Sequence, residues 1–251
     1  MKITIWNEFI HEQKFAEIKK IYPTGIHKQI GSLFETEHTV NYATLEMPNH
    51  GLTKELLEET DVLFWWGHMA HDQVADEVVE MVHQQVLKGM GLIVLHSGHA
   101  SKIFKRVLGT DSGYLKWREA AEKEIIWNIN PAHDIAQGLG DHFIIEHEEM
   151  YGEHFNIPEP DENIFISSFQ GGEVFRSGAC WYRGLGRIFY FRPGHEAYPT
   201  YYHPEVQRVL LNGAQWAKRR TNDQIVYGNT KPIFEFEEEA NLINLHSLHQ
   251  E

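Results

Sequence analysis

Imidazole and carboxylate side chains follow several apolar runs in this sequence. His96 comes directly after the run Gly91–Leu95, and His195 and Glu196 come shortly after the run Gly186–Phe191. Imidazole titrates near neutral pH and also ligates divalent metals, so these residue types suit proton transfer or metal binding. The sequence therefore predicts a site that works either with a bound metal or by His and Glu acid–base catalysis alone.

His96 is predicted at the tip of a sharp connection between a strand and a helix. Such an elbow needs small residues two positions on either side of the residue that it displays. With His96 at the tip, Gly98 is the small residue that follows. With Ser97 at the tip, the flanking residues would be Leu95 and His99, which are bulky. We therefore expect the elbow to display His96, and a hydrolase that uses Ser97 is disfavoured.

A run of acidic residues at 146–153 follows an apolar stretch and contains Tyr151, which indicates a segment folded over a ligand. Only one of Glu148 and Glu149 is expected to point to the site, because successive side chains of an extended strand face opposite sides. Glu196 could orient an imidazole by accepting its second N–H. The candidate catalytic residues are His96, His195, Glu148, Glu149 and Glu196.

Three histidines are candidate metal ligands: His68, His96 and His195. Cys180 is the only cysteine, so a metal such as Zn²⁺ would need His and carboxylate ligands. His68 and His71 are three residues apart, a spacing that suits two ligands on one helical turn. Alternatively, Asp72 caps the next helix and explains this local composition without a metal.

Polar and aromatic residues near strand ends are the candidates for binding a small ligand. Trp65 and Trp66 could offer a ring platform or belong to the core, and we expect one to face each side of the sheet. The substrate-binding candidates are Asn7, Glu8, Trp66, His68, His99, Tyr151, Glu153 and Tyr198.

These candidates must be positioned by alternating strands and amphipathic helices. The pattern indicates a doubly wound, mostly parallel α/β sheet, in which ligands bind at the carboxyl ends of the strands. We predict strands at 3–6, 39–42, 61–66 and 91–95, and helices at 25–34, after Asp72, and at 102–108.

The second half of the chain is predicted to add an antiparallel edge portion. Its short strands are expected at 124–129, 143–146, 163–167 and 186–191, followed by a last helix from Pro204 to Ala217. We expect a single domain over residues 1–251, with an acidic appendage at about 222–251.

Charge and hydropathy exclude two classes of partner. The net charge of −14 disfavours a nucleic-acid surface, and no apolar run approaches the length of a membrane span. The first residues lack the layout of a secretory signal, so we predict a cytoplasmic protein.

Two segments resemble class I glutamine amidotransferases. Val94-Leu95-His96-Ser97-Gly98-His99-Ala100 is similar to their nucleophile loop, and residues 190–196 are similar to the strand that carries their catalytic histidine and glutamate. His96 stands where that superfamily has its cysteine. Without the thiolate, covalent glutaminase chemistry is excluded.

Nearly the whole chain resembles the ThuA-like trehalose utilisation family. The resemblance rests on Trp65-Trp66-Gly67-His68, the His96 turn, and residues 146–153 and 194–196. It implies a flavodoxin-like fold, a role in using trehalose or related disaccharides, and a partnership with an NAD-dependent oxidoreductase that makes 3-keto sugars.

Two functions stay open from the sequence. The first is an isomerase, lyase or hydrolase acting on a disaccharide or its 3-keto derivative. The second is a non-catalytic sugar-binding or regulatory subunit of that oxidoreductase, since the scaffold lacks its nucleophile. We also expect a homo-oligomer, because the antiparallel portion offers exposed edges and aromatic surface.

Overall fold

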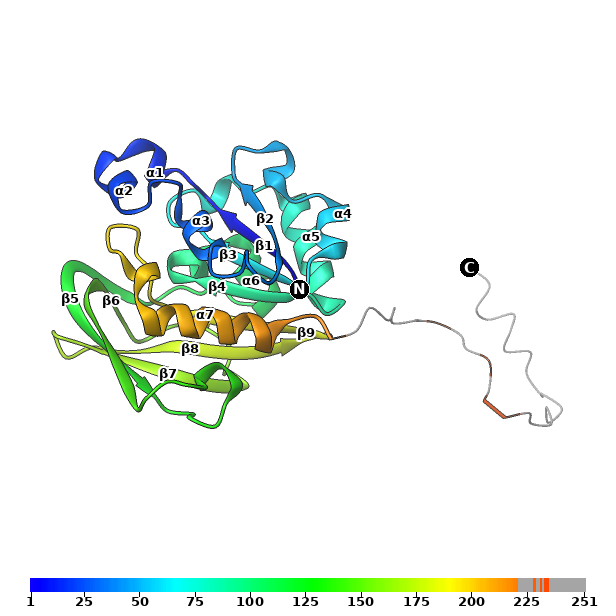
Figure 1. Cartoon of the computed structure of the whole chain (residues 1–251). Helices are drawn as coiled ribbons and strands as arrows, with labels where there is room; N and C mark the ends of the chain where they lie inside the picture. Colours follow the sequence, from blue (N-terminus) through cyan, green and yellow to red (C-terminus); the bar gives the residue numbers. More distant parts are fainter. Residues whose placement is uncertain (221–227, 229–230, 232, 235–251) are drawn as a thin grey trace.

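A single mixed sheet organises the chain (Figure 1). The computed structural model describes residues 1–220, 228, 231, 233 and 234, so the predicted acidic appendage lies almost entirely outside the described residues. Within them the sheet has nine strands in the order β2-β1-β3-β4-β9-β8-β7-β5-β6. The strands are β1 Lys2–Asn7, β2 Thr39–Thr44, β3 Val62–Trp66, β4 Gly91–Leu95, β5 Lys116–Asn128, β6 His142–Gly152, β7 Glu162–Phe169, β8 Val174–Arg183 and β9 Gly186–Phe191.

Helices cover both faces of the parallel half, in which β2, β1, β3, β4 and β9 pair side by side. Every residue of β3 and β4 is buried, as expected for strands covered on both sides. Apolar residues of α4, α5 and α6 pack on one face, and those of α3 and α7 pack on the other. The helices are α1 His11–Lys14, α2 Ala16–Ile21, α3 Ile26–Gly31, α4 Lys54–Glu59, α5 Asp76–Leu87, α6 Lys102–Leu108 and α7 Pro204–Ala217.

The mixed α/β class and the antiparallel portion are confirmed, with differences in length. β8 was not predicted, β5 begins eight residues earlier than expected, and β6 runs through the acidic segment. The pairing of β5 with β6 shifts register on both sides of Glu122. β5 pairs with β7 only from Glu124 onward, so residues 116–122 of β5 and 148–152 of β6 form a two-stranded extension, here called the hairpin arm.

The turn after β4 has the predicted elbow geometry. His96 is the first residue after the strand and has a φ of 49°, a conformation that residues other than glycine rarely adopt. A Cβ at Gly98 would lie 2.8 Å from Val94 Cγ1 and 3.3 Å from the carbonyl oxygen of Trp65. The backbone therefore needs glycine two residues after His96.

Two local predictions were wrong. Asp72 does not cap the following helix, because it lies in a short 3-10 turn at His71–Gln73 and α5 begins at Asp76 after Ala75. The helix predicted at 25–34 is shorter, since α3 ends at Gly31 and the following residues form turns. None of the helices in the described part of the chain is long and apolar enough to cross a membrane.

Replacing Gly98 tests the elbow. Gly98→Ala should lower the free energy of unfolding by about 1–3 kcal/mol, because the added methyl group meets Val94 and Trp65 at less than contact distance. Urea unfolding measures this loss. Gly140→Ala is the control, since the nearest atom to its Cβ would be 3.8 Å away, and it should change stability by less than about 0.5 kcal/mol. Equal stabilities for the two variants would contradict the elbow packing.

Candidate functional site

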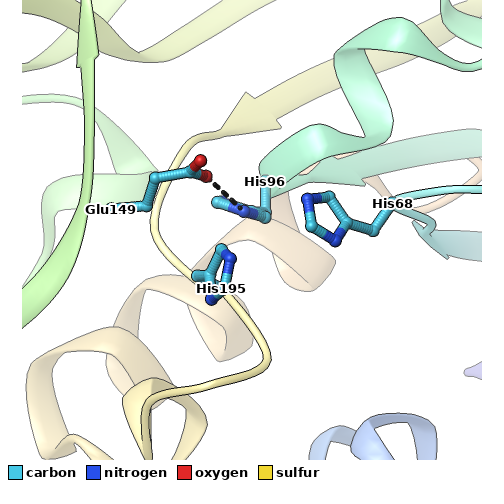
Figure 2. Close-up of side chains that lie close together, drawn as sticks. All are labelled: His68, His96, Glu149 and His195. Carbon is cyan, nitrogen blue, oxygen red and sulfur yellow. Dashed lines mark ion pairs between the residues drawn. The ribbon is translucent and has the colours of Figure 1, made fainter. Parts of the chain in front are cut away.

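Three imidazoles and one carboxylate converge at the carboxyl ends of neighbouring strands (Figure 2). His68 follows β3, His96 follows β4, His195 follows β9, and Glu149 reaches them from β6. One nitrogen or oxygen atom of each side chain lies within 4.8 Å of the corresponding atoms of the others. This group of His68, His96, Glu149 and His195 is called the histidine cluster. It occupies the edge of the sheet where such folds bind ligands.

In the pair of His96 and Glu149, one hydrogen-bond acceptor atom of each side chain lies opposite the other. His96 is fully buried, and its Nδ1 lies 3.0 Å from the carbonyl oxygen of Arg192, so this nitrogen is assigned the proton. The lone pair of Nε2 then faces Glu149 Oε2 at 3.2 Å, and neither atom has a hydrogen-bond partner. Burial lowers the pKa of His96 well below its usual value and raises the pKa of Glu149. A proton or a cation must therefore lie between these two atoms.

His195 has the opposite assignment of its ring nitrogens. Its Nδ1 accepts a hydrogen bond from the backbone N–H of Ala197 at 3.1 Å, so the proton of the neutral ring is on Nε2. That Nε2 lies 3.3 Å from Glu119 Oε2 and 3.9 Å from Glu196 Oε1. Burial, and next the neighbouring His96 imidazole, lower the pKa of His195 to about 4. His195 is thus a neutral imidazole that presents an N–H.

Glu196 holds two imidazoles from one carboxylate oxygen. Its Oε1 lies 3.0 Å from His68 Nδ1 and 3.1 Å from His11 Nε2. Burial alone would raise the pKa of Glu196, but the close contact with His68 and the other nearby imidazoles lower it to about 2. Burial likewise opposes protonation of His68, but Glu196 outweighs it and the pKa of His68 is raised. In the neutral His68 ring with its proton on Nδ1, which lies 3.0 Å from Glu196 Oε1, the lone pair is on Nε2.

A buried ion network supports the cluster from behind. Arg192 is fully buried, forms an ion pair with Glu124 and lies 3.6 Å from Glu148 Oε2. It also donates a hydrogen bond of 2.6 Å to the carbonyl oxygen of Glu149. Because its own carbonyl oxygen fixes His96, Arg192 holds two members of the cluster at once.

Glu148 and Glu149 face opposite sides of β6, and only Glu149 reaches the histidines. Glu148 accepts hydrogen bonds from the backbone N–H groups of Gly194 and His195, at 2.8 and 3.1 Å, and from the Thr200 hydroxyl. Burial raises the pKa of Glu148 to about 7 in spite of Arg192. Its contacts therefore hold the loop that carries His195.

The polar groups at the end of β1 are also engaged with backbone and side chains. Glu8 accepts the backbone N–H groups of His68, Met69 and Ala70 at 2.9 to 3.1 Å, so it fixes the loop of His68. Asn7 donates to Glu12 at 2.7 Å and accepts from the backbone N–H of Phe9 at 2.8 Å.

The aromatic candidates lie around the cluster at different depths. Trp65 and Trp66 face opposite sides of the sheet, and both are buried, so neither ring face is open to solvent. Trp66 Nε1 donates to the carbonyl oxygen of Gly194 at 3.1 Å. The Tyr151 ring stacks on His96 at 5.3 Å, and Tyr198 lies beside His195 at 5.6 Å.

Four further candidates lie outside the cluster. His99 is buried against Tyr151, and Glu153 forms an ion pair with Arg176 at 2.8 Å. His71 belongs to neither of the two groups of potential metal ligands found among the described residues, the second of which is His11, His68 and Glu196. Ser97 donates or accepts a hydrogen bond with the Tyr151 hydroxyl at 2.8 Å, without a histidine partner.

Comparison with known proteins decides the family. The model of the ThuA family, described as trehalose utilisation, matches residues 2–217. The chain belongs to the ThuA family. No match was found among curated proteins.

Solved structures share the ThuA fold at low sequence identity. A ThuA-like protein from Parabacteroides merdae is 14% identical with a TM-score of 0.65, and the match covers 86% of this chain and 88% of that one. A ThuA-like protein from Bacteroides uniformis is 15% identical with a TM-score of 0.61, covering 86% and 90%. A cytoplasmic protein from Salmonella typhimurium is 13% identical with a TM-score of 0.60, covering 87% and 100%. At these identities the likeness shows a common fold.

Several residues of this ThuA-family site were missed by sequence reasoning. Glu119 reaches His195 from the hairpin arm, His11 reaches Glu196 from α1, and Glu124 pairs with Arg192. The sequence position of Arg192, between the end of a buried strand and His195, could have indicated that it belongs to the site. Glu119 and His11 carried none, since the strand around Glu119 and the short helix α1 were not predicted.

Removing the Glu148 carboxylate tests whether it holds the His195 loop. Glu148→Ala should lower the free energy of unfolding by about 3 kcal/mol or more, because it leaves buried donors of Gly194, His195 and Thr200 without an acceptor. Glu173→Ala breaks a solvent-screened ion pair with Arg118 and should cost much less. Urea unfolding compares the two, and a loss for Glu148→Ala as small as that of the control would contradict this role.

Proposed function

We propose that this ThuA-family chain is a cytoplasmic enzyme of trehalose or disaccharide utilisation that acts on a disaccharide or its 3-keto derivative at the histidine cluster. The parallel strand order β2-β1-β3-β4-β9 supports the flavodoxin-like form of this fold, with its ligand site at the strand ends. The observation that carries the proposal is the pair of buried, unpartnered acceptors His96 Nε2 and Glu149 Oε2. A binding surface alone has no need for such a pair.

A divalent cation such as Zn²⁺ fits between these atoms. Ligand atoms of a tetrahedral zinc ion with bonds of about 2.0–2.1 Å are about 3.3 Å apart, close to the 3.2 Å between His96 Nε2 and Glu149 Oε2. His68 Nε2 would be the third ligand, oriented by Glu196 as carboxylates commonly orient metal-bound imidazoles. The cation would polarise a substrate carbonyl group.

His195 and Glu119 are suited to move a proton next to that carbonyl. His195 carries its proton on Nε2, 3.3 Å from Glu119 Oε2, so the nitrogen that would bind a metal is protonated. Glu119 is partly exposed and accepts a hydrogen bond from the Tyr198 hydroxyl. Glu119 would take the proton from the carbon next to a keto group, while the His195 N–H would donate to the oxygen on which negative charge develops. Return of the proton would complete isomerisation or epimerisation, and loss of a leaving group instead would complete β-elimination.

The alternative is a sugar-binding or regulatory subunit that works with an NAD-dependent sugar oxidoreductase. It needs a sugar site but no proton transfer, so a test that follows the proton separates the two functions. Association of two copies through the antiparallel portion is compatible with either function, since β6 is an edge strand.

Metal content tests the ligand set. The protein purified without an affinity tag should bind about one Zn²⁺ per chain, and His96→Ala and Glu149→Ala should each lower the affinity by about tenfold or more. Calorimetry with ZnCl₂ on protein treated with a chelator measures this. His83→Ala is the control, since His83 lies on α5 beside Glu80. Unchanged affinity in both cluster variants would contradict the assignment.

The same titration should depend on pH with a defined sign. The proton and the cation compete for His68, and the pKa of His68 is raised by Glu196. Protonated His68 therefore becomes more common as the pH falls, and Zn²⁺ affinity should decrease from pH 8 to pH 6. Affinity that does not change over this range would exclude His68 as a ligand.

Deuterium exchange tests the proton transfer. In D₂O, NMR should show loss of the proton next to the keto group of 3-keto-trehalose with wild-type protein, and exchange at least about 100-fold slower with His195→Ala. His133→Ala is the control, because this buried histidine pairs with Glu162, away from the cluster. Binding without exchange in wild type would favour the non-catalytic subunit.

A further inference from the structure

Trp117 is an exposed tryptophan on the hairpin arm, two residues before Glu119, which contacts His195 of the histidine cluster. Its exposed fraction is 66%, although tryptophan usually buries most of its surface. Among the described residues, no aromatic ring contacts the Trp117 ring and no group accepts a hydrogen bond from its indole N–H. The ring is therefore free to contact a ligand.

The strand register places Trp117 on the site side of the hairpin arm. Trp117 is paired directly with Tyr151, and residues opposite each other on antiparallel strands have side chains on the same face. Tyr151 stacks on His96, and Glu119, two residues after Trp117, contacts His195. Arg118 between them pairs with Glu173 on the other face, which confirms the alternation.

Trp117 and Glu119 thus form a row that leads outward from the cluster. Two residues along a strand span about 7 Å, so the indole lies about one sugar ring beyond Glu119. Glu119 and the Tyr198 hydroxyl are hydrogen-bonded to each other and lie beside His195, where they can bind hydroxyl groups. The row offers polar groups next to the cluster and an aromatic face farther out.

We propose that Trp117 is a stacking platform for the second ring of a disaccharide whose reacting ring lies at the histidine cluster. This role of Trp117 rests on the proposed function. It would give the site a preference for sugars with two rings over sugars with one. The C–H face of a pyranose ring is apolar, so covering the indole with it removes apolar surface of both from water. The ring hydroxyls stay at the edge and keep their contact with water.

Binding of trehalose and of glucose to the full chain, measured by calorimetry, tests the platform. Trp117→Ala should weaken trehalose binding by about tenfold and leave glucose binding unchanged, while Trp117→Phe should keep part of the affinity. Trp127→Ala is the matched control, because Trp127 is on the same strand and 42% exposed, and its indole N–H donates to Ser168. It should bind both sugars like wild type.

The outcomes separate the platform from the function on which it rests. Trehalose binding by Trp117→Ala equal to wild type overturns the platform and leaves the sugar site standing. An equal loss for glucose and trehalose also overturns it, since Trp117 would then act on the reacting ring or on the arm. If wild type binds neither sugar, the platform for trehalose fails together with the form of the proposed function that acts on an unoxidised disaccharide. Thermal melting of each variant verifies that it is folded.

Discussion

The site depends on one buried guanidinium. Arg192 has no exposed surface, and its charge is offset by the carboxylates of Glu124 and Glu148. An unpaired charge at this depth would cost several kcal/mol, so the three groups must be buried together. Through its side chain and its carbonyl oxygen, Arg192 joins β9, the hairpin arm and the elbow of β4. These are the elements that carry His195, Glu149 and His96.

Burial of these groups also sets the chemistry available. Desolvation keeps His96 and His195 neutral, and the hydrogen bond that each ring makes with the backbone decides which nitrogen carries the proton. The result is a lone pair on His96 and an N–H on His195, at rings 5.3 Å apart. One ring is suited to bind a cation and the other to donate a hydrogen bond or a proton from its N–H.

Local patterns were sufficient to predict the parallel half and the position of His96. The runs at β3 and β4 are apolar throughout because both faces are covered, and Gly98 follows His96 at the spacing that a tight turn requires. The grouping of His68, His96 and His195 followed from the rule that strand ends share one edge of the sheet. The roles of these residues stay proposals.

The hairpin arm could not be predicted, because its shape comes from long-range pairing. The register shift at Glu122 releases residues 116–122 from β7, and only this brings Glu119 to His195. The predicted helix cap at Asp72 was wrong because residues 71–73 form a separate 3-10 turn before the helix begins. The prediction that Trp65 and Trp66 face opposite sides of the sheet is confirmed. Their complete burial could not be predicted, because it depends on helices from both halves of the chain.

The most direct test of a cation in the histidine cluster is anomalous X-ray scattering at the zinc edge from crystals of the protein grown with ZnCl₂. We expect one strong peak about 2.0–2.2 Å from His68 Nε2, His96 Nε2 and a carboxylate oxygen of Glu149, with His195 outside the coordination sphere. Zinc bound only at surface carboxylates, with no peak in the cluster, would contradict the account and leave acid–base catalysis or sugar binding without a metal.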